Sequence, residues 1–456
     1  MPVYARDKQV PIPPFGKVDV SGVLPVLNAP EIQRLRNSTQ LAFSRYSFPG
    51  AEHSRYTHSL AVMGNTTELV NELFARDFFE DVDRTQLRID LQIAALVHDA
   101  GHPPFGHPTE YVLKHWHGGF NHKELTAELV LENLKRPIRK AGSNEERIAR
   151  LLDKSAKGDP EGLIVTGEYG VDKITYCIQD LYFTGVPEIS IRLDARNLFT
   201  YFGWVNKRLM IEEKGIDAAK AFQELIQELY IHCYFRKQNL AHQRLYEKAL
   251  QYLMMELGIL PKQVSRFYES SLDTLLREPR KNPVIGSCYE RISFPDKWLK
   301  VAAAIKVAGY EHAARVAGKS MTVIGASAKD VKILTEYYEN PLNETKAEKK
   351  IAHALGLEES DVVITTPPDP VKLVPRDIPL VTKDGVQTHT VFERSKAHYH
   401  KLLERGRDSY TFNIFVPKEH RKRASGAAHE LVAIVKQECG LLKSQQSLFS
   451  DADKLD

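Results

Sequence analysis

The stretch HDAGHPPFGHPTEYVLKHWHGGFNH, residues 98–122, contains six of the 17 histidines in this 456-residue chain. Its first two residues, His98 and Asp99, offer an imidazole beside a carboxylate. Such a mixed pair suits Fe, Mn, Zn or Mg better than a metal ion that prefers thiolates. The stretch therefore predicts a metal site, with the remaining imidazoles available for proton transfer.

Apolar residues recur at helical spacing before this pair: Leu87, Leu91, Ala94 and Ala95. They predict a buried helix that ends near His98. Successive helical residues point about 100° apart, so His98 and Asp99 can share one metal only where the backbone leaves the helix. Gly101 and the prolines at 103–104 supply such an ending. Taken alone, the pair fits an ordinary helix C-terminus equally well.

Two further segments can complete a metal site. His58 belongs to RYTHS, residues 55–59, at the start of an amphipathic pattern, where an element boundary is expected. Downstream, Asp172, Tyr176 and Asp180 recur every four residues and share one face of a predicted helix. The opposite face is apolar, so the polar stripe is either solvated or turned toward a cavity.

These motifs resemble the HD-domain superfamily of metal-dependent phosphohydrolases, whose signature is H…HD…D. Within it the chain is similar to the deoxynucleoside triphosphate triphosphohydrolases, which include the bacterial dGTPases and the SAM-and-HD-domain dNTPases. The resemblance runs through QRLRNSTQL, FPGAEHSRYTHSL, HDAGHPPFGH, GGFNHKE and VDKITYCIQD, in that order. It implies a divalent metal ion, either Mn, Fe, Mg, Zn or Co, with four protein ligands: His58, His98, Asp99 and Asp172.

The resemblance also implies roles for other residues. It places His102, His107 and His122 around the phosphates, and it makes His107 the proton donor to the leaving oxygen. Glu110 would orient His107, and its position three residues later allows the pairing within a helix. The implied substrate contacts are Gln40, Leu41, Arg55, Lys173, Tyr176, Asp180, His242 and Tyr246. Tyr246 could instead pack in the core without contacting a substrate. Gln40 could likewise be an exposed residue, with Leu41 beside it in the core.

Two positions depart from the family. Where relatives carry Asp-x-x-His-Gly, a motif associated with an activating nucleotide, this chain has VDVSG at residues 18–22. The departure argues against nucleotide activation of the family type. A phosphate-binding arginine of relatives is replaced by Gln238, which leaves Arg236, Lys237 or Arg244 to supply the charge.

The expected fold is mainly α-helical, an HD-type phosphohydrolase core followed by a smaller α+β lobe. Residues 1–310 form the predicted catalytic domain, whose all-α core carries its motifs between about residues 31 and 250. Short β-type runs begin after residue 310: MTVI at 321–324, VVITT at 362–366 and YTFNIFV at 410–416. They assign residues 311–456 to the C-terminal lobe.

Local signals refine this expectation. The first thirty residues contain six prolines and should be extended and rich in turns. A helix is expected from Glu31 to Gln40, and another begins after Asn121, with Glu124 completing a capping box. Residues 216–257 again show a helical pattern.

Composition limits the classes of protein that this chain can be. The formal net charge of +3, with 27% charged residues, describes a soluble protein without a dominant field, so charge alone indicates neither nucleic acid nor membrane. The basic run at 418–423 is expected to be solvated, with weak contact to single-stranded nucleic acid as the lesser alternative. Four scattered cysteines, no apolar run near the ~20 residues of a membrane span and no signal-peptide pattern favour a cytoplasmic protein.

The predicted function is metal-dependent hydrolysis of deoxynucleoside triphosphates, dGTP among them, to deoxynucleoside and tripolyphosphate, by a homo-oligomer. Two alternatives stay open. One is another HD phosphohydrolase, acting on nucleoside monophosphates or a guanosine alarmone, and the other is a nucleotide-sensing or nucleic-acid-binding regulatory protein. The pair of His107 and Glu110 argues against a sensor, because binding alone requires no proton donor.

Overall fold

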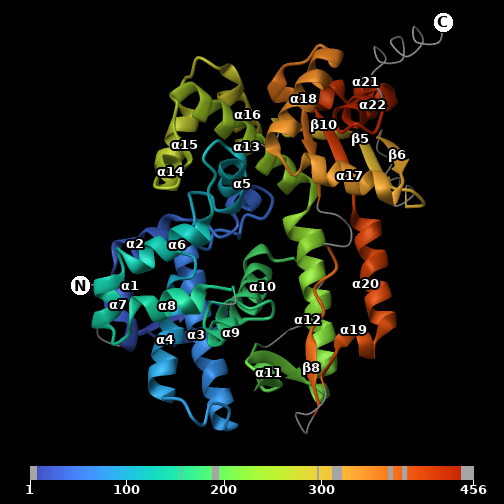
Figure 1. The fold of residues 1–456 in the computed structure, drawn as a ribbon. Coiled ribbons are helices and arrows are strands. Elements are labelled where there is room, and N and C mark those ends of the chain that lie inside the picture. Colours follow the sequence, from blue (N-terminus) through green and yellow to red (C-terminus); the bar gives the residue numbers. More distant parts are fainter. Residues whose placement is uncertain are drawn as a thin grey trace, which may run out of the picture.

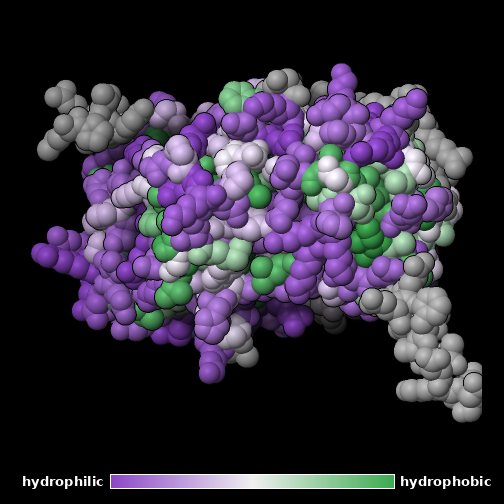
Figure 2. All heavy atoms as spheres, turned by 90° about the horizontal axis from the view of Figure 1, so that it is seen from above, coloured by the Kyte–Doolittle hydropathy of each residue, from purple (hydrophilic) through white to green (hydrophobic). Residues whose placement is uncertain are grey.

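The computed structural model describes residues 8–155, 157–186, 195–294, 297–310, 321–367, 373–382 and 388–442. Over these residues the fold is mainly α-helical with small β-sheets, as the sequence predicted. Figure 1 shows the blue and teal N-terminal helices on one side, and the orange and red C-terminal lobe above and opposite them. The face seen in Figure 2 is largely hydrophilic, with interspersed hydrophobic patches. Within the described ranges, no helix combines the length and apolarity needed to cross a membrane.

Two long helices form the centre of the N-terminal part: α3 (Arg55–Ala75) and α4 (Arg84–Val97). They pack along each other. The apolar residues that predicted the second helix are all buried in the main core: Leu87, Leu91, Ala94 and Ala95. Because α4 ends at Val97, His98 and Asp99 follow its last regular turn, as expected.

A third helix, α10 (Val171–Thr184), packs on α3 and carries the polar stripe that begins at Asp172. Shorter helices lie between α4 and α10: α5 (His107–His115), α6 (His122–Leu131), α7 (Lys135–Lys140), α8 (Glu145–Leu152) and α9 (Leu163–Thr166). The predicted cap of α6 is present, since the Asn121 side-chain oxygen accepts the Lys123 N–H at 2.9 Å. The predicted capping box is not formed, because Glu124 accepts a hydrogen bond from the Asn121 side-chain amide, at 3.4 Å, and not from the Asn121 backbone N–H.

The chain before α3 differs in part from expectation. Residues 9–19 form a hairpin of β1 (Gln9–Ile12) and β2 (Gly16–Asp19), followed by a short helix, α1 (Leu24–Leu27). The helix expected from Glu31 to Gln40 is wrong at its far end. It consists of α2 (Pro30–Gln33) and a 3-10 turn that ends at Asn37.

Gln40 and Leu41 instead lie in a short link between this turn and a second 3-10 segment, Ala42–Tyr46. Thr39 pairs with Ser54 in an isolated β-bridge, and the Gln40 N–H donates to the His53 carbonyl at 3.0 Å. Asn, Ser and Thr compete for hydrogen bonds with the helical backbone, so the run at 37–39 is a natural place for the helix to end.

The region predicted as helical from 216 to 257 is two helices joined by an irregular turn. They are α12 (Ile216–Leu229) and α13 (Lys237–Leu257), and a π-helical turn occupies Tyr230–Tyr234 between them. α13 anchors a second core with α14 (Pro261–Val264), α15 (Glu269–Arg277) and α16 (Pro283–Ser293).

The C-terminal lobe is built on a four-stranded sheet in the order β6-β5-β10-β7. Its strands are β5 (Lys300–Val307), β6 (Thr322–Ala326), β7 (Val363–Thr365) and β10 (Phe412–Val416). The helices of this lobe are α17 (Ala328–Tyr338), α18 (Pro341–Leu355), α21 (Arg421–Gly426) and α22 (Ala428–Glu438). The three predicted β-type runs are confirmed. β5 begins before the predicted boundary at residue 310, which stays a prediction.

A third sheet ties the end of the chain to its middle. Strands β3 (Phe202–Val205) and β4 (Arg208–Glu212) are joined by β8 (Pro379–Val381) and β9 (Thr388–Thr390), and β8 runs parallel to β4. The helices α19 (Val391–Arg394) and α20 (Lys396–Ser409) then pack on α12, which Figure 1 shows running alongside α20.

Charged side chains are buried between α13 and α18. Arg244 contacts the carboxylates of Glu348 at 2.9 Å and Glu344 at 3.1 Å, and Lys248 contacts Glu348 at 2.9 Å. Burial raises the pKa of Glu344 well above its usual range. Glu348 also accepts the backbone N–H of Ile364 at 2.9 Å, so one carboxylate joins both helices to β7.

We expect Glu348→Ala to lower the free energy of unfolding by roughly 3–5 kcal/mol, because it leaves two buried cations without their shared partner. Urea denaturation followed by circular dichroism measures the change. Glu336→Ala is the matched control, since its pair with Lys332 is exposed and should contribute only about 0.3–0.5 kcal/mol. Equal losses in the two variants would show that the buried network does not hold the lobes together.

Candidate active site

The four residues predicted to bind a metal come from three helices and lie together. His58 Nε2 is 3.1 Å from Asp172 Oδ1, and His98 Nε2 is 3.4 Å from the same oxygen. His98 Nε2 is also 3.3 Å from Asp99 Oδ1. Ligand atoms of His58, His98 and Asp99 all lie within 4.8 Å of one another, a grouping that could hold a metal ion.

The surroundings of His98 fit a metal ligand. Its Nδ1 donates to the Ala95 carbonyl at 2.8 Å, which fixes the ring and leaves Nε2 to face the two carboxylates. Nε2 is buried and has no hydrogen-bond partner among the described residues. Burial alone would lower the pKa of His98, but Asp99 and Asp172 outweigh it and raise the pKa to about 9. The negative charge of these two carboxylates also favours a divalent cation at this position.

Asp99 links this cluster to Arg55. The guanidinium Nη1 donates to Asp99 Oδ2 at 2.7 Å, and His102 Nε2 lies 3.4 Å from Oδ1. Burial raises the pKa of Asp99, but His98, His102 and Arg55 together hold it well below its usual range. Gly106 makes room for the guanidinium, since a Cβ at that position would lie 2.3 Å from Arg55 Nη2.

A second group surrounds Glu110. Its Oε2 is 3.1 Å from His107 Nδ1, and its Oε1 is 2.6 Å from His122 Nδ1. The rings of His122 and His102 stack with centroids 3.9 Å apart. Burial raises the pKa of Glu110, but its hydrogen bonds with His107 and His122 bring it well below the usual range. The His107 side chain is 71% exposed, so its other ring nitrogen is free to face a ligand.

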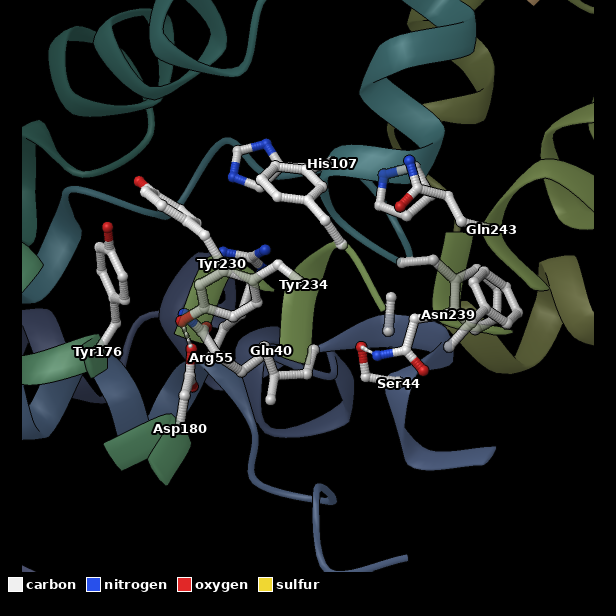
Figure 3. A pocket seen from close by; sticks show the side chains of 16 residues that line it. Gln40, Ser44, Arg55, His107, Tyr176, Asp180, Tyr230, Tyr234, Asn239 and Gln243 are labelled. Carbon is white, nitrogen blue, oxygen red and sulfur yellow. Dashed lines mark hydrogen bonds between the residues drawn. The ribbon is translucent and has the colours of Figure 1, made fainter. Parts of the chain in front are cut away.

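A cavity of about 420 Å³ lies beside these groups (Figure 3). Predicted residues that line it are Gln40, Leu41, Arg55, His107, Tyr176 and Asp180. Residues that were not predicted also line it: Ala42, Phe43, Ser44, Phe105, Pro108, Tyr230, Tyr234, Phe235, Asn239 and Gln243. In the view of Figure 3, Tyr176 and Asp180 lie toward one end, and Ser44, Asn239 and Gln243 lie toward the other.

Comparison with known protein families matches residues 55–168 to the HD domain. The chain contains an HD domain. An uncharacterized protein of Methanocaldococcus jannaschii is 29% identical over 209 residues, which are 45% of this chain and 41% of that protein. The deoxynucleoside triphosphate triphosphohydrolase SAMHD1 of Xenopus laevis is 43% identical over 82 residues, which are 18% of this chain and 13% of that protein. The matches therefore span less than half the length of these curated relatives.

A solved structure of a phosphohydrolase from Bacteroides thetaiotaomicron has the same fold. It superposes with a TM-score of 0.67 at 19% sequence identity, over 90% of this chain and 100% of that one. The shared architecture therefore extends beyond the HD domain to the C-terminal lobe.

Three predicted substrate contacts lie outside the cavity that adjoins the HD domain. Tyr246 is fully buried, packs against Phe43 at a centroid distance of 4.4 Å and shares a hydrogen bond with Thr109. His242 pairs with Gln238 at 3.0 Å, and burial lowers the pKa of His242 to about 4. Lys173 donates to Glu168 at 2.5 Å. Direct contact of these three with a substrate stays a prediction, while Tyr246 supports the wall that Phe43 forms.

Arg244, one of three residues considered as a substitute for the missing arginine, does not fill that role. It is buried against Glu344 and Glu348, so its charge is already compensated. Arg236 and Lys237 line a different cavity.

Asp180 is buried and already paired, which the sequence did not indicate. It contacts His53 Nε2 at 2.9 Å and accepts the Tyr234 hydroxyl at 2.5 Å. Tyr230, Tyr234 and Phe235 reach the cavity because the π-helical turn interrupts the helical register there. The aromatic cluster in YIHCYF was the available signal, although its spacing suggested a continuous helix.

Two charged residues position the loops of the HD domain from outside the metal cluster. Arg34 donates to the carbonyls of Ala100 at 2.5 Å and His102 at 2.9 Å. The buried Glu269 carboxylate accepts the backbone N–H groups of Thr39 and Phe105, both at 2.9 Å. It thereby joins the segment that carries Gln40 to the loop that precedes His107.

We expect His98→Ala to abolish both bound metal and activity, because it removes one of four ligands from a small coordination shell. His107→Ala should retain the metal and lose turnover, because His107 lies in the other group. Metal content of the purified variants, measured by inductively coupled plasma mass spectrometry, tests both statements.

His115→Ala is the control for the loss of a histidine, since His115 bonds to the Tyr111 carbonyl of its own helix and does not line the cavity. Wild-type metal content in His98→Ala would show that the ligand assignment is wrong. Loss of metal in His107→Ala would make His107 a ligand.

Proposed function

We propose that this chain hydrolyses deoxynucleoside triphosphates, dGTP among them, to deoxynucleoside and tripolyphosphate with a divalent metal ion. The observation that supports this most is that one cavity is lined by the guanidinium of Arg55, the imidazole of His107 and the ring of Tyr176. Arg55 joins that cavity to the metal-binding cluster through Asp99. One site thus offers a phosphate end, a proton donor and a wall for the sugar.

The phosphate end combines the metal cluster with Arg55. A divalent ion bound there would polarise the α-phosphate and lower the pKa of a water molecule. Asp99 occupies Nη1 of Arg55, whereas Nε is buried with no partner among the described residues. A phosphate oxygen would satisfy that donor with a charge-assisted hydrogen bond.

His107 is suited to protonate the departing 5′ oxygen. Glu110 holds its Nδ1, so Nε2 is left to donate a proton toward the cavity as the P–O bond breaks. A protein that only sensed nucleotides would gain nothing from this pair. The arrangement therefore favours an enzyme over a regulatory binding protein.

The remainder of the cavity suits a nucleoside. Tyr176 lies one helical turn after Asp172, so its ring follows directly on the metal cluster. Aromatic rings of Phe105 and Tyr234 supply surfaces on which a base can stack. Gln40 offers an amide that can donate to and accept from a base edge.

We expect dGTP and the Mn²⁺-loaded protein to give deoxyguanosine and tripolyphosphate as first products. In oxygen-18 water the label should enter tripolyphosphate, because water attacks phosphorus while His107 protonates the 5′ oxygen. Phosphorus NMR and mass spectrometry of the products measure both.

Label in the nucleoside, or orthophosphate as the first product, would contradict attack at the α-phosphorus. If the protein hydrolyses nucleoside monophosphates or a guanosine alarmone but no deoxynucleoside triphosphate, the same site catalyses the alternative phosphohydrolase reaction. The His107→Ala variant controls for contaminating phosphatases, because it should form none of these products.

We expect Tyr176→Ala to lower the ratio of dGTP to GTP turnover by roughly 10-fold to 100-fold, chiefly because GTP turnover rises. The planar ring would leave no room and no acceptor for a 2′-hydroxyl, and burying an unpaired hydroxyl costs ~1–3 kcal/mol. The ratio of kcat/KM values for the two nucleotides is the measurement.

Tyr182→Ala is the matched control, because Tyr182 lies on the same helix with 58% of its surface exposed. An equal loss of dGTP and GTP turnover in Tyr176→Ala, or equal wild-type activity on both nucleotides, would rule out Tyr176 as the steric gate.

A further inference from the structure

Three polar side chains lie at the end of the active-site cavity opposite Tyr176 (Figure 3). Ser44 belongs to the 3-10 segment Ala42–Tyr46, whereas Asn239 and Gln243 lie four residues apart on α13. Residues at this spacing project from the same face of a helix. The sequence predicted none of the three, and the proposed reaction gives them no role.

Asn239 can offer only its carbonyl oxygen to a ligand. Its side chain is buried, and its Nδ2 donates to the Cys233 carbonyl at 2.7 Å and to Ser44 Oγ at 3.3 Å. Both hydrogens of the amide are therefore used. The reversed amide would place its oxygen against the Cys233 carbonyl, so these hydrogen bonds fix the orientation. Oδ1 remains as a buried acceptor with no partner among the described residues.

Gln243 offers an acceptor in the same way. Its Nε2 donates to the Glu247 carboxylate at 2.8 Å, one turn further along α13. An ionised carboxylate accepts hydrogen bonds and donates none, so the oxygen of Gln243 is left for the cavity. Glu247 lies 3.8 Å from Arg244, within the buried network between α13 and α18. The orientation of Gln243 therefore depends on a partner that is itself held in place.

Ser44 adds a donor to these two acceptors. Its Oγ accepts from Asn239, and among the described residues no acceptor is found for its hydroxyl hydrogen. Asn239 lies between Ser44 and Gln243 in Figure 3. This end of the cavity therefore presents one donor followed by two acceptors.

The wall beside this end suits a flat ring. Phe43 immediately precedes Ser44, and its ring stacks on that of Phe105 with the centroids 5.0 Å apart. Both rings line the cavity. A base that stacks on this wall can direct its edge toward α13.

We propose that Ser44, Asn239 and Gln243 recognise the edge of a guanine base, which makes dGTP the preferred substrate. Guanine presents O6 as an acceptor, followed by N1–H and the 2-amino group as donors, and this order complements that of the three side chains. The preference in turnover rests on the proposed function, whereas recognition of the base does not require hydrolysis.

The other bases oppose this arrangement at one or more positions. Adenine would place the N1 lone pair against the oxygen of Asn239, and cytosine would place acceptors against both amide oxygens. Thymine would match Ser44 and Asn239 but would turn O2 toward Gln243. Two acceptors that face each other in a buried site are both left unpaired, so each mismatch costs more than the loss of one hydrogen bond.

Turnover is tested with dGTP, dITP and dATP on the Mn²⁺-loaded protein. The hypoxanthine base of dITP keeps O6 and N1–H and lacks only the 2-amino group, so it isolates the contact with Gln243. We expect kcat/KM for dGTP to exceed that for dITP by roughly tenfold, and dATP to have a lower value still. The assays are run at about pH 8.5, because burial raises the pKa of Glu247 to about 7 and the ionised carboxylate is required.

Gln243→Met removes the acceptor and keeps the length of the side chain. It should lower the ratio of kcat/KM for dGTP to that for dITP by roughly tenfold. Gln92→Met is the matched control and should keep the wild-type ratio, because Gln92 is half-buried, donates to Thr67 at 2.9 Å and does not line the cavity. Equal wild-type kcat/KM for dGTP and dITP, or an unchanged ratio in Gln243→Met, would overturn the proposal.

Binding of deoxynucleosides to the wild-type protein requires neither hydrolysis nor a variant. Ligand-observed NMR titration should give a Kd for deoxyguanosine roughly tenfold below that for deoxyinosine. Equal Kd values would overturn the recognition of guanine and leave the hydrolysis of deoxynucleoside triphosphates standing. Preferential binding of deoxyguanosine by a protein that hydrolyses no deoxynucleoside triphosphate would overturn the proposed function and leave the recognition of guanine standing.

Discussion

The arrangement of the site depends on the buried pair of Arg55 and Asp99. One residue begins α3 and the other follows α4, and the guanidinium donates to the carboxylate at 2.7 Å. Both groups are almost fully buried. A buried charge without a partner costs several kcal/mol, so the position of each group restricts the position of the other. Asp99 also faces His98 and His102. The pair thus sets the position of the cavity that Arg55 lines relative to the cluster that could hold a metal ion.

The loops around this pair are irregular, yet charged side chains from elsewhere hold them. Arg34 satisfies two carbonyls where the backbone leaves α4, and Glu269 satisfies two N–H groups on separate loops. Buried backbone groups outside helices and sheets require such partners. The site therefore combines three helices, α3, α4 and α10, which bring the four predicted metal-binding residues together, with loops whose position depends on residues far away in the sequence.

The sequence predicted the helical core and the convergence of the HD ligands well, because apolar periodicity and the histidine-rich motifs are local signals. It did not predict β5, since KVAAAIKV is rich in alanine, which favours helices when read alone. It also missed the entry of Tyr234 and Phe235 into the cavity, because the spacing of the aromatic residues suggested a continuous helix and a π-helical turn changes the register. The pairing of Asp180 with His53 joins residues 127 positions apart, and only the tertiary structure reveals it.

The parallel pairing of β4 with β8 means that the middle of the chain is completed by a strand near its end. During synthesis, residues 202–212 leave the ribosome long before residues 379–381 exist, so the edge of β4 waits for its partner. An exposed strand edge is a template for pairing with other chains. The newly made N-terminal part therefore keeps this edge open to association until residues 379–381 have emerged, and its yield in cells should depend on chaperones that bind such edges.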